Sequence, residues 1–122
     1  MATILAVDDM RSMRELVKSV LEKNGHNVII HDDGQTAYQF AQSSTVDLVI
    51  SDINMPLMDG ISLVSSLRQL ANYKSTPILM LTTEDAPEKK DQARAAGANG
   101  WIQKPFNPDR LINAVDKTLA KN

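Results

Sequence analysis

Short apolar segments alternate along the chain with segments in which apolar residues are spaced more widely. The apolar runs are rich in β-branched residues and occupy positions 4–7, 28–30, 48–50 and 78–81, with a weaker one at Trp101-Ile102. Near-continuous runs of this length are typical of strands that are buried on both faces. We therefore predict five short strands in a sheet that is covered on both sides.

Between these runs the apolar residues recur with the spacing of an α-helix. The clearest case fits one helix face at positions i, i+3, i+4, i+7 and i+8: Met13, Leu16, Val17, Val20 and Leu21. Weaker patterns follow the same spacing: Tyr38, Phe40 and Ala41 after Asp33-Gly34; Leu63, Val64, Leu67 and Leu70; and Leu111, Ile112, Val115 and Leu119. Together with a polar segment at 88–96, these patterns predict five helices.

Glycine and proline mark several of the predicted helix ends. Gly25 is a plausible stop for the first helix, and Pro87 and Gly97 bracket the segment 88–96. Asn107-Pro108 provides an N-cap and a first helical residue for the last helix.

The elements thus alternate as strand and helix five times, which favours an α/β fold with a parallel sheet and helices on both faces. With right-handed crossovers, five strands most simply take the order 2-1-3-4-5, the flavodoxin-like arrangement. In such folds ligands bind outside the carboxyl ends of the strands, where the strand order reverses. The residues that follow each strand are therefore the candidates for function.

Length and composition narrow the class of protein. The chain has 122 residues, which suits one domain spanning residues 1–122, and it contains no cysteine, which excludes disulfides and cysteine-ligated zinc. Its net charge of -2 argues against a nucleic-acid partner. No apolar run approaches the roughly 20 residues that span a membrane, and the start does not resemble a signal peptide. We expect a cytoplasmic monomer that is not bound to membranes.

Polar residues with complementary chemistry follow four of the predicted strands. They are Asp8 and Asp9 after the first strand, Asp52 after the third, Thr82 after the fourth and Lys104 after the fifth. Three converging carboxylates repel one another unless a cation is present, and oxygen ligands suit Mg²⁺, or alternatively Mn²⁺. An ammonium and a hydroxyl across the cleft would suit a phosphoryl group, which a carboxylate can accept as nucleophile.

Each of these residues also has an ordinary structural interpretation. Asp8-Asp9 is a common helix N-cap pair, Asp52 and Thr82 are common at turns, and an isolated Lys104 is usually a solvated surface residue. The functional interpretation depends on all four strand ends agreeing.

Four motifs, with the spacing between them, resemble the response-regulator receiver family over essentially the whole chain. They are Val7-Asp8-Asp9, then residues 52–60 (DINMPLMDG), then Leu81-Thr82-Thr83-Glu84, and Lys104-Pro105-Phe106. The resemblance is strongest to single-domain CheY-type proteins of bacterial chemotaxis, particularly in residues 8–14 (DDMRSMR).

The resemblance implies a role for each matching residue. Asp52 would be the phosphorylated aspartate, and Asp9, Asp52 and the backbone carbonyl of Asn54 would bind Mg²⁺, with Asp8 acting through metal-bound water. Thr82 would turn toward the phosphoryl group and Lys104 would pair with it, and the Lys104–Pro105 bond would be cis. Trp101 would occupy the aromatic switch position, where the best-known chemotaxis members carry tyrosine.

The resemblance also implies a phosphorelay function. A sensor histidine kinase, of the CheA type, would phosphorylate Asp52, and the modified protein would bind a target through the face formed by the last two helices and the last strand, about Pro87 to Lys121. We expect that no output domain follows Asn122 and that output therefore occurs by protein binding, with the flagellar motor switch as a candidate target. We expect catalysis of its own phosphorylation and dephosphorylation but no turnover of external substrates.

Three alternatives remain open at this stage. The protein could be a phosphate sink that drains the kinase without a target of its own, an idea that Trp101 raises. A Mg²⁺-dependent phosphatase with an aspartate nucleophile is disfavoured because Asn54 stands where such enzymes have a second aspartate. A flavin-binding module is disfavoured because the loop after the first strand is acidic.

Overall fold

The computed structural model describes residues 2–55, 57–83 and 87–120. Pro56 and Glu84 of the sequence motifs, and Lys121 at the end of the expected binding face, lie outside the described residues. The strands form one parallel sheet in the order β2-β1-β3-β4-β5. Their bounds are β1 Thr3–Val7, β2 Asn27–His31, β3 Leu48–Asp52, β4 Ile78–Thr82 and β5 Gly100–Gln103. The predicted strands and their order are confirmed, each strand being one or two residues longer than its apolar run.

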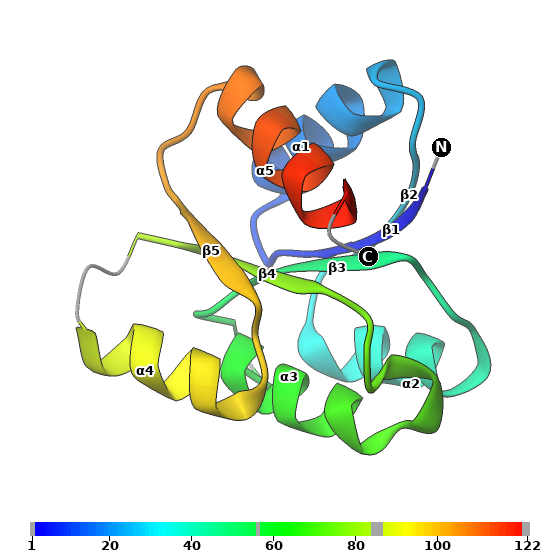
Figure 1. Cartoon of the computed structure of the whole chain (residues 1–122), viewed down its shortest axis with the longest axis vertical. Coiled ribbons are helices and arrows are strands. Elements are labelled where there is room, and N and C mark those ends of the chain that lie inside the picture. Colours follow the sequence, from blue (N-terminus) through cyan, green and yellow to red (C-terminus); the bar gives the residue numbers. More distant parts are fainter. Residues whose placement is uncertain (1, 56, 84–86, 121–122) are drawn as a thin grey trace.

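The helices cover both faces of the sheet (Figure 1). Helices α1 (Arg11–Lys23) and α5 (Pro108–Ala120) lie on one face, and α2 (Gly34–Ser43), α3 (Gly60–Gln69) and α4 (Pro87–Ala96) lie on the other. A short 3₁₀ helix, η1 (Ala71–Tyr73), follows α3 and was not predicted from the sequence. The predicted fold class, a five-stranded parallel sheet flanked by five helices, is confirmed.

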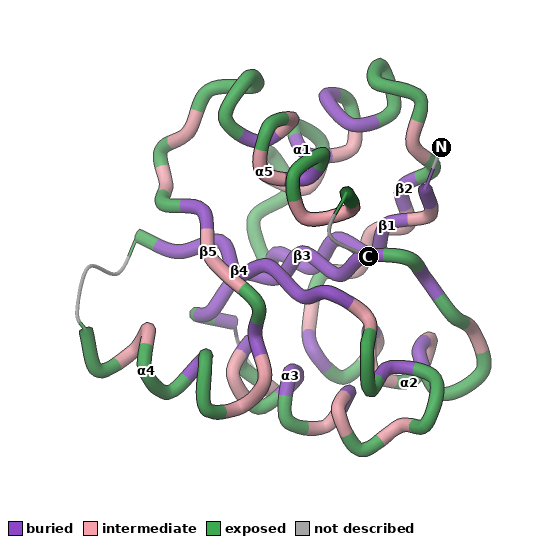
Figure 2. The backbone as a smooth tube through the Cα atoms, viewed as in Figure 1, coloured by how far each residue is buried: buried purple, intermediate pink, exposed green. Residues whose placement is uncertain are grey.

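The core consists of two apolar clusters, one on each side of the sheet. Strands β3 and β4 are buried along their whole length, as Figure 2 shows, because helices cover them on both sides. Helix α1 packs through Val17, Val20 and Leu21, whereas Leu16, predicted in the same stripe, is 38% exposed. The buried stripe of α1 is thus narrower than its apolar spacing indicated.

Local capping fixes where two of the helices begin. The side chain of Asp33 accepts a hydrogen bond from the Thr36 N–H at the start of α2, and Asp59 accepts one from the Ser62 N–H at the start of α3, both at 2.8 Å. Such caps satisfy backbone donors that the first helical turn leaves unpaired. None of the described helices is long and apolar enough to cross a membrane.

Candidate functional site

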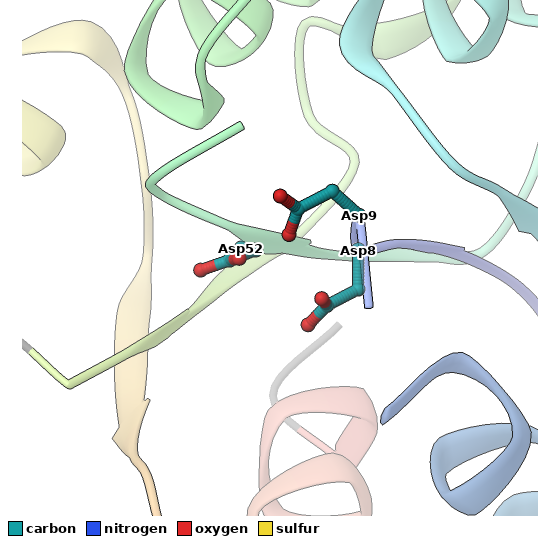
Figure 3. Close-up of side chains that lie close together, drawn as sticks. All are labelled: Asp8, Asp9 and Asp52. Carbon is teal, nitrogen blue, oxygen red and sulfur yellow. The ribbon is translucent and has the colours of Figure 1, made fainter. Parts of the chain in front are cut away.

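Three carboxylates converge at the carboxyl edge of the sheet, from the ends of β1 and β3 (Figure 3). The two strands pair with Val7 opposite Ser51, so the residues that follow, Asp8 and Asp52, lie side by side. One carboxylate oxygen from each of Asp8, Asp9 and Asp52 lies within 4.8 Å of the others. Asp8 and Asp52 are buried and Asp9 is exposed. The sequence-predicted convergence of these three residues is therefore present.

Asp8 is held by three donors from the protein. Its Oδ1 accepts the Met10 N–H at 2.9 Å, its Oδ2 accepts Lys104 Nζ at 2.9 Å, and its carbonyl oxygen accepts Arg14 Nη1 at 2.7 Å. With both carboxylate oxygens engaged, Asp8 has less freedom to turn than Asp9.

Lys104 reaches the acids from the other side of the site. Its Nζ lies 2.9 Å from Asp8 and 3.5 Å from Asp52, and its side chain is only 10% exposed. The Lys104 backbone N–H donates to the carbonyl of Thr82, and the Lys104–Pro105 bond is cis, as the family resemblance implied. The ammonium partly neutralises the site but leaves it with more negative than positive charge.

This arrangement of charges shifts the pKa of the Asp52 carboxyl group upward. Burial, and next the neighbouring Asp8 carboxylate, raise the pKa of Asp52 to about 6, although Lys104 and a hydrogen bond from the Asn54 backbone act to lower it. A bound cation would favour the ionised form and return the pKa toward its ordinary range. The set of oxygen donors fits a hard divalent cation such as Mg²⁺.

Thr82 and Trp101 lie on the two strands beyond Asp52. Thr82 is the last residue of β4 and is buried, and the β4 residue before it, Leu81, pairs with Asp52 of β3. Trp101, on β5, is half-buried. All the predicted site residues thus lie on adjacent strand ends or the loops that follow them, except Trp101, which lies near the start of β5.

Two contributors were not assigned a role from the sequence. Arg14 holds the β1–α1 turn through the Asp8 carbonyl, a contact that only the fold of α1 reveals. Gly60 begins α3 directly against Asp52, and a Cβ added there would overlap the Asp52 carbonyl oxygen. The Asp59-Gly60 pair in the motif was the available signal for this close approach.

The fold and site define a class: α/β receiver-like domains with a cluster of carboxylates and a lysine at the point where the strand order reverses. The chain belongs to the response regulator receiver domain family, whose model matches residues 4–116.

Individual relatives are CheY-type proteins over nearly the full chain. The chain is 41% identical to chemotaxis protein CheY-3 of Vibrio cholerae, covering 97% of this chain and 92% of that protein. It is 37% identical to chemotaxis protein CheY of Pseudomonas aeruginosa, covering 97% and 96%. The structure of CheY4 of Vibrio cholerae superposes with a TM-score of 0.93 at 47% identity, covering 97% and 98%. The chain is therefore a CheY-like receiver, and two-component chemotaxis signalling is the context that these relatives support.

A more distant relative bears on the metal. The receiver domain of a sensor histidine kinase from Pseudomonas aeruginosa, 25% identical with a TM-score of 0.90 and covering 98% of each chain, is described with a magnesium ion in its active-site cleft.

Proposed function

We propose that this protein is a response regulator that accepts a phosphoryl group on Asp52 from a sensor histidine kinase and then signals by binding another protein. The observation that carries this proposal is the Asp8, Asp9 and Asp52 group with Lys104 at 2.9 and 3.5 Å from two of its members. Carboxylates alone would bind only a cation, whereas carboxylates together with the Lys104 ammonium suit an incoming phosphoryl group.

In this function a carboxylate oxygen of Asp52 attacks phosphorus, the new O–P bond forms, and the N–P bond of the donor phosphohistidine breaks. The raised pKa of Asp52 means that the apo site holds this nucleophile partly protonated near pH 6. Lys104 already lies within reach of Asp52 and can follow the phosphoryl oxygens once charge moves onto them.

The metal that suits this site is Mg²⁺, with Mn²⁺ as an alternative. Asp9, Asp52 and the backbone carbonyl of Asn54 would hold it. Asp8 would act through a metal-bound water, because both of its carboxylate oxygens accept hydrogen bonds from the protein. When bound, the ion supplies positive charge for the phosphoryl oxygens.

Output is proposed to run through Thr82 and Trp101 to the surface of α4, β5 and α5, within the described residues 87–120. Phosphorylation adds charge that draws Thr82 and Lys104 toward it, and the change spreads to neighbouring side chains. The named relatives are chemotaxis proteins, and on that ground we propose a CheA-like kinase and the flagellar motor switch as partners, in the cytoplasm.

Two measurements test this function. Intact-mass spectrometry after incubation with acetyl phosphate and Mg²⁺ should show one added phosphoryl group on the wild type and none on Asp52→Asn. Asp59→Asn is a matched control, since it changes an exposed carboxylate of the same loop and keeps a capping side chain. Undiminished phosphorylation of Asp52→Asn would contradict the proposal.

The second measurement separates signalling from a phosphate sink. Pull-downs from a lysate with the protein saturated in beryllofluoride and Mg²⁺ should retain a protein that the Asp52→Asn variant, treated in the same way, does not. Identical captured proteins in both states, with phosphorylation intact, would favour the sink.

A further inference from the structure

Two cations of helix α4 lie against the ring of Trp101. Lys90 Nζ is 5.1 Å from the ring centroid and the guanidinium carbon of Arg94 is 5.0 Å from it. The two residues are four apart on one helix and so share a face. Both distances are within the range in which the negative face of an indole ring attracts a cation. We refer to Lys90, Arg94 and Trp101 as the Trp101 clamp.

Helix α4 has few other side chains that could hold it in place. Among its residues only Ala93 is buried, and an alanine contributes little apolar surface. Much of the remaining helix surface is polar and exposed, including Glu88, Asp91 and Gln92. Ala96 also packs on the apolar core, and the clamp adds a side-chain contact that joins α4 to β5.

The clamped ring is close to the part of the site that is expected to respond to phosphorylation. In the β4–β5 register Met80 lies opposite Trp101, and Thr82 lies opposite Gln103. Side chains two residues apart on a strand point to the same face, so Thr82 and Trp101 are diagonal neighbours on one face of the sheet. Trp101 packs on the same apolar cluster that contains Met80. A displacement of Thr82 toward Asp52 would change the space beside the Trp101 ring.

We propose that Lys90 and Arg94 restrain Trp101 in the half-buried position it has here, so that the clamp opposes activation and sets how far phosphorylation shifts the protein toward its active form. This inference rests on the proposed function, because it assumes that Asp52 phosphorylation moves Trp101. The cations act as positioning residues and do not touch the reacting atoms.

The expected size of the effect follows from the two contacts. If the ring leaves both cations on activation, removing both charges favours the active form by about tenfold, and removing one by about threefold. The half-saturating concentration of beryllofluoride, measured at saturating Mg²⁺, should fall about tenfold in the double variant Lys90→Gln, Arg94→Gln. It should fall about threefold in either single variant.

Lys89→Gln is the matched control. It removes an identical charge from the adjacent position of α4, about 100° around the helix from Lys90, and should leave the beryllofluoride titration unchanged. Arg94→Lys keeps a cation on the ring and should restore most of the restraint. Trp101 is the only tryptophan of the chain, so its emission reports each titration without interference.

Fluorinated tryptophan provides a test that leaves every charge in place. Biosynthetic incorporation changes only position 101, and each added fluorine weakens the negative face of the ring with little change of shape. For all proteins the half-saturating beryllofluoride concentration is measured from the protection of Trp101 against iodide quenching that beryllofluoride gives in the presence of Mg²⁺. This concentration should fall with each added fluorine. In the double variant Lys90→Gln, Arg94→Gln it should not change with the number of fluorines.

The outcomes separate the clamp from the proposed function. A double variant that titrates like Lys89→Gln, or a fluorine series equally steep with and without the cations, would overturn the clamp. A higher half-saturating concentration in the double variant would overturn it as well, since the cations would then favour activation. If the unchanged protein shows no response to beryllofluoride and no phosphorylation of Asp52, the proposed function itself fails, and the role of the clamp in activation fails with it.

Discussion

Replacing Asp52 by asparagine should stabilise the folded protein in metal-free buffer at neutral pH, although it removes the proposed phosphoacceptor. Burial and the Asp8 carboxylate raise the pKa of Asp52 to about 6, whereas an aspartate in the unfolded chain has a pKa of about 3.9. The folded state therefore binds this proton more tightly than the unfolded state does. Ionising Asp52 consequently costs folding free energy, and an uncharged amide of similar shape avoids that cost.

The magnitude follows from the pKa difference. A difference of about two pKa units corresponds to about 3 kcal/mol at most, and water at the mouth of the site reduces the cost to about 1–2 kcal/mol. The cost is absent below about pH 4, where Asp52 is protonated in both states, and grows between about pH 4 and 6. Above about pH 6 it is fully present. The advantage of Asp52→Asn should therefore appear with rising pH across this window.

Urea unfolding in the presence of EDTA, at several pH values from 4 to 7.5, measures this difference. Asp91→Asn, which changes an exposed carboxylate on α4, controls for general charge effects. Saturating Mg²⁺ should narrow the gap, because the ion stabilises the folded wild type by binding its ionised site. A difference between wild type and Asp52→Asn that does not change with pH, or a less stable variant at pH 7.5, would refute the reasoning.

Three further predictions concern the metal, the backbone and the output of the site. Asp9→Ala should abolish the rise in melting temperature that Mg²⁺ gives the wild type, and an equal rise in both would place the ion elsewhere. Gly60→Ala should lower the free energy of unfolding by about 1–3 kcal/mol in urea titrations, since a methyl group there overlaps the Asp52 carbonyl; wild-type stability would mean that α3 shifts freely. Thr82→Ala should still be phosphorylated but show a smaller change of Trp101 emission with beryllofluoride, and a full response would remove Thr82 from the output.

The fold and the central residues of the site could be predicted because each depends on local sequence. Continuous apolar runs identify strands buried on both faces, and strict alternation with helices leaves few possible sheet orders. Once β1 and β3 are neighbours, Asp8 and Asp52 at their carboxyl ends must lie close together. Convergence of the acids therefore followed from topology without any knowledge of side-chain contacts.

What could not be predicted depends on contacts between elements far apart in the sequence or on fine packing. The spacing of apolar residues in α1 included Leu16, but the helix sits on the sheet so that this residue is 38% exposed. The bond from Arg14 to the Asp8 carbonyl depends on where α1 starts relative to β1. The cations over Trp101 come from a helix that the sequence marked only by its flanking proline and glycine, so nothing local indicated their target.

The central claim is that Asp52 carries the phosphoryl group, and chemical mapping of the modified residue tests it most directly. After incubation with acetyl phosphate and Mg²⁺, borohydride reduces an aspartyl phosphate to homoserine, which peptide mass spectrometry locates in the chain. The account predicts homoserine at position 52 alone, and none when Mg²⁺ is removed with EDTA. Homoserine at Asp8 or Asp9 with Asp52 unmodified, or no reduced residue in a protein that intact mass shows to be phosphorylated, would contradict it.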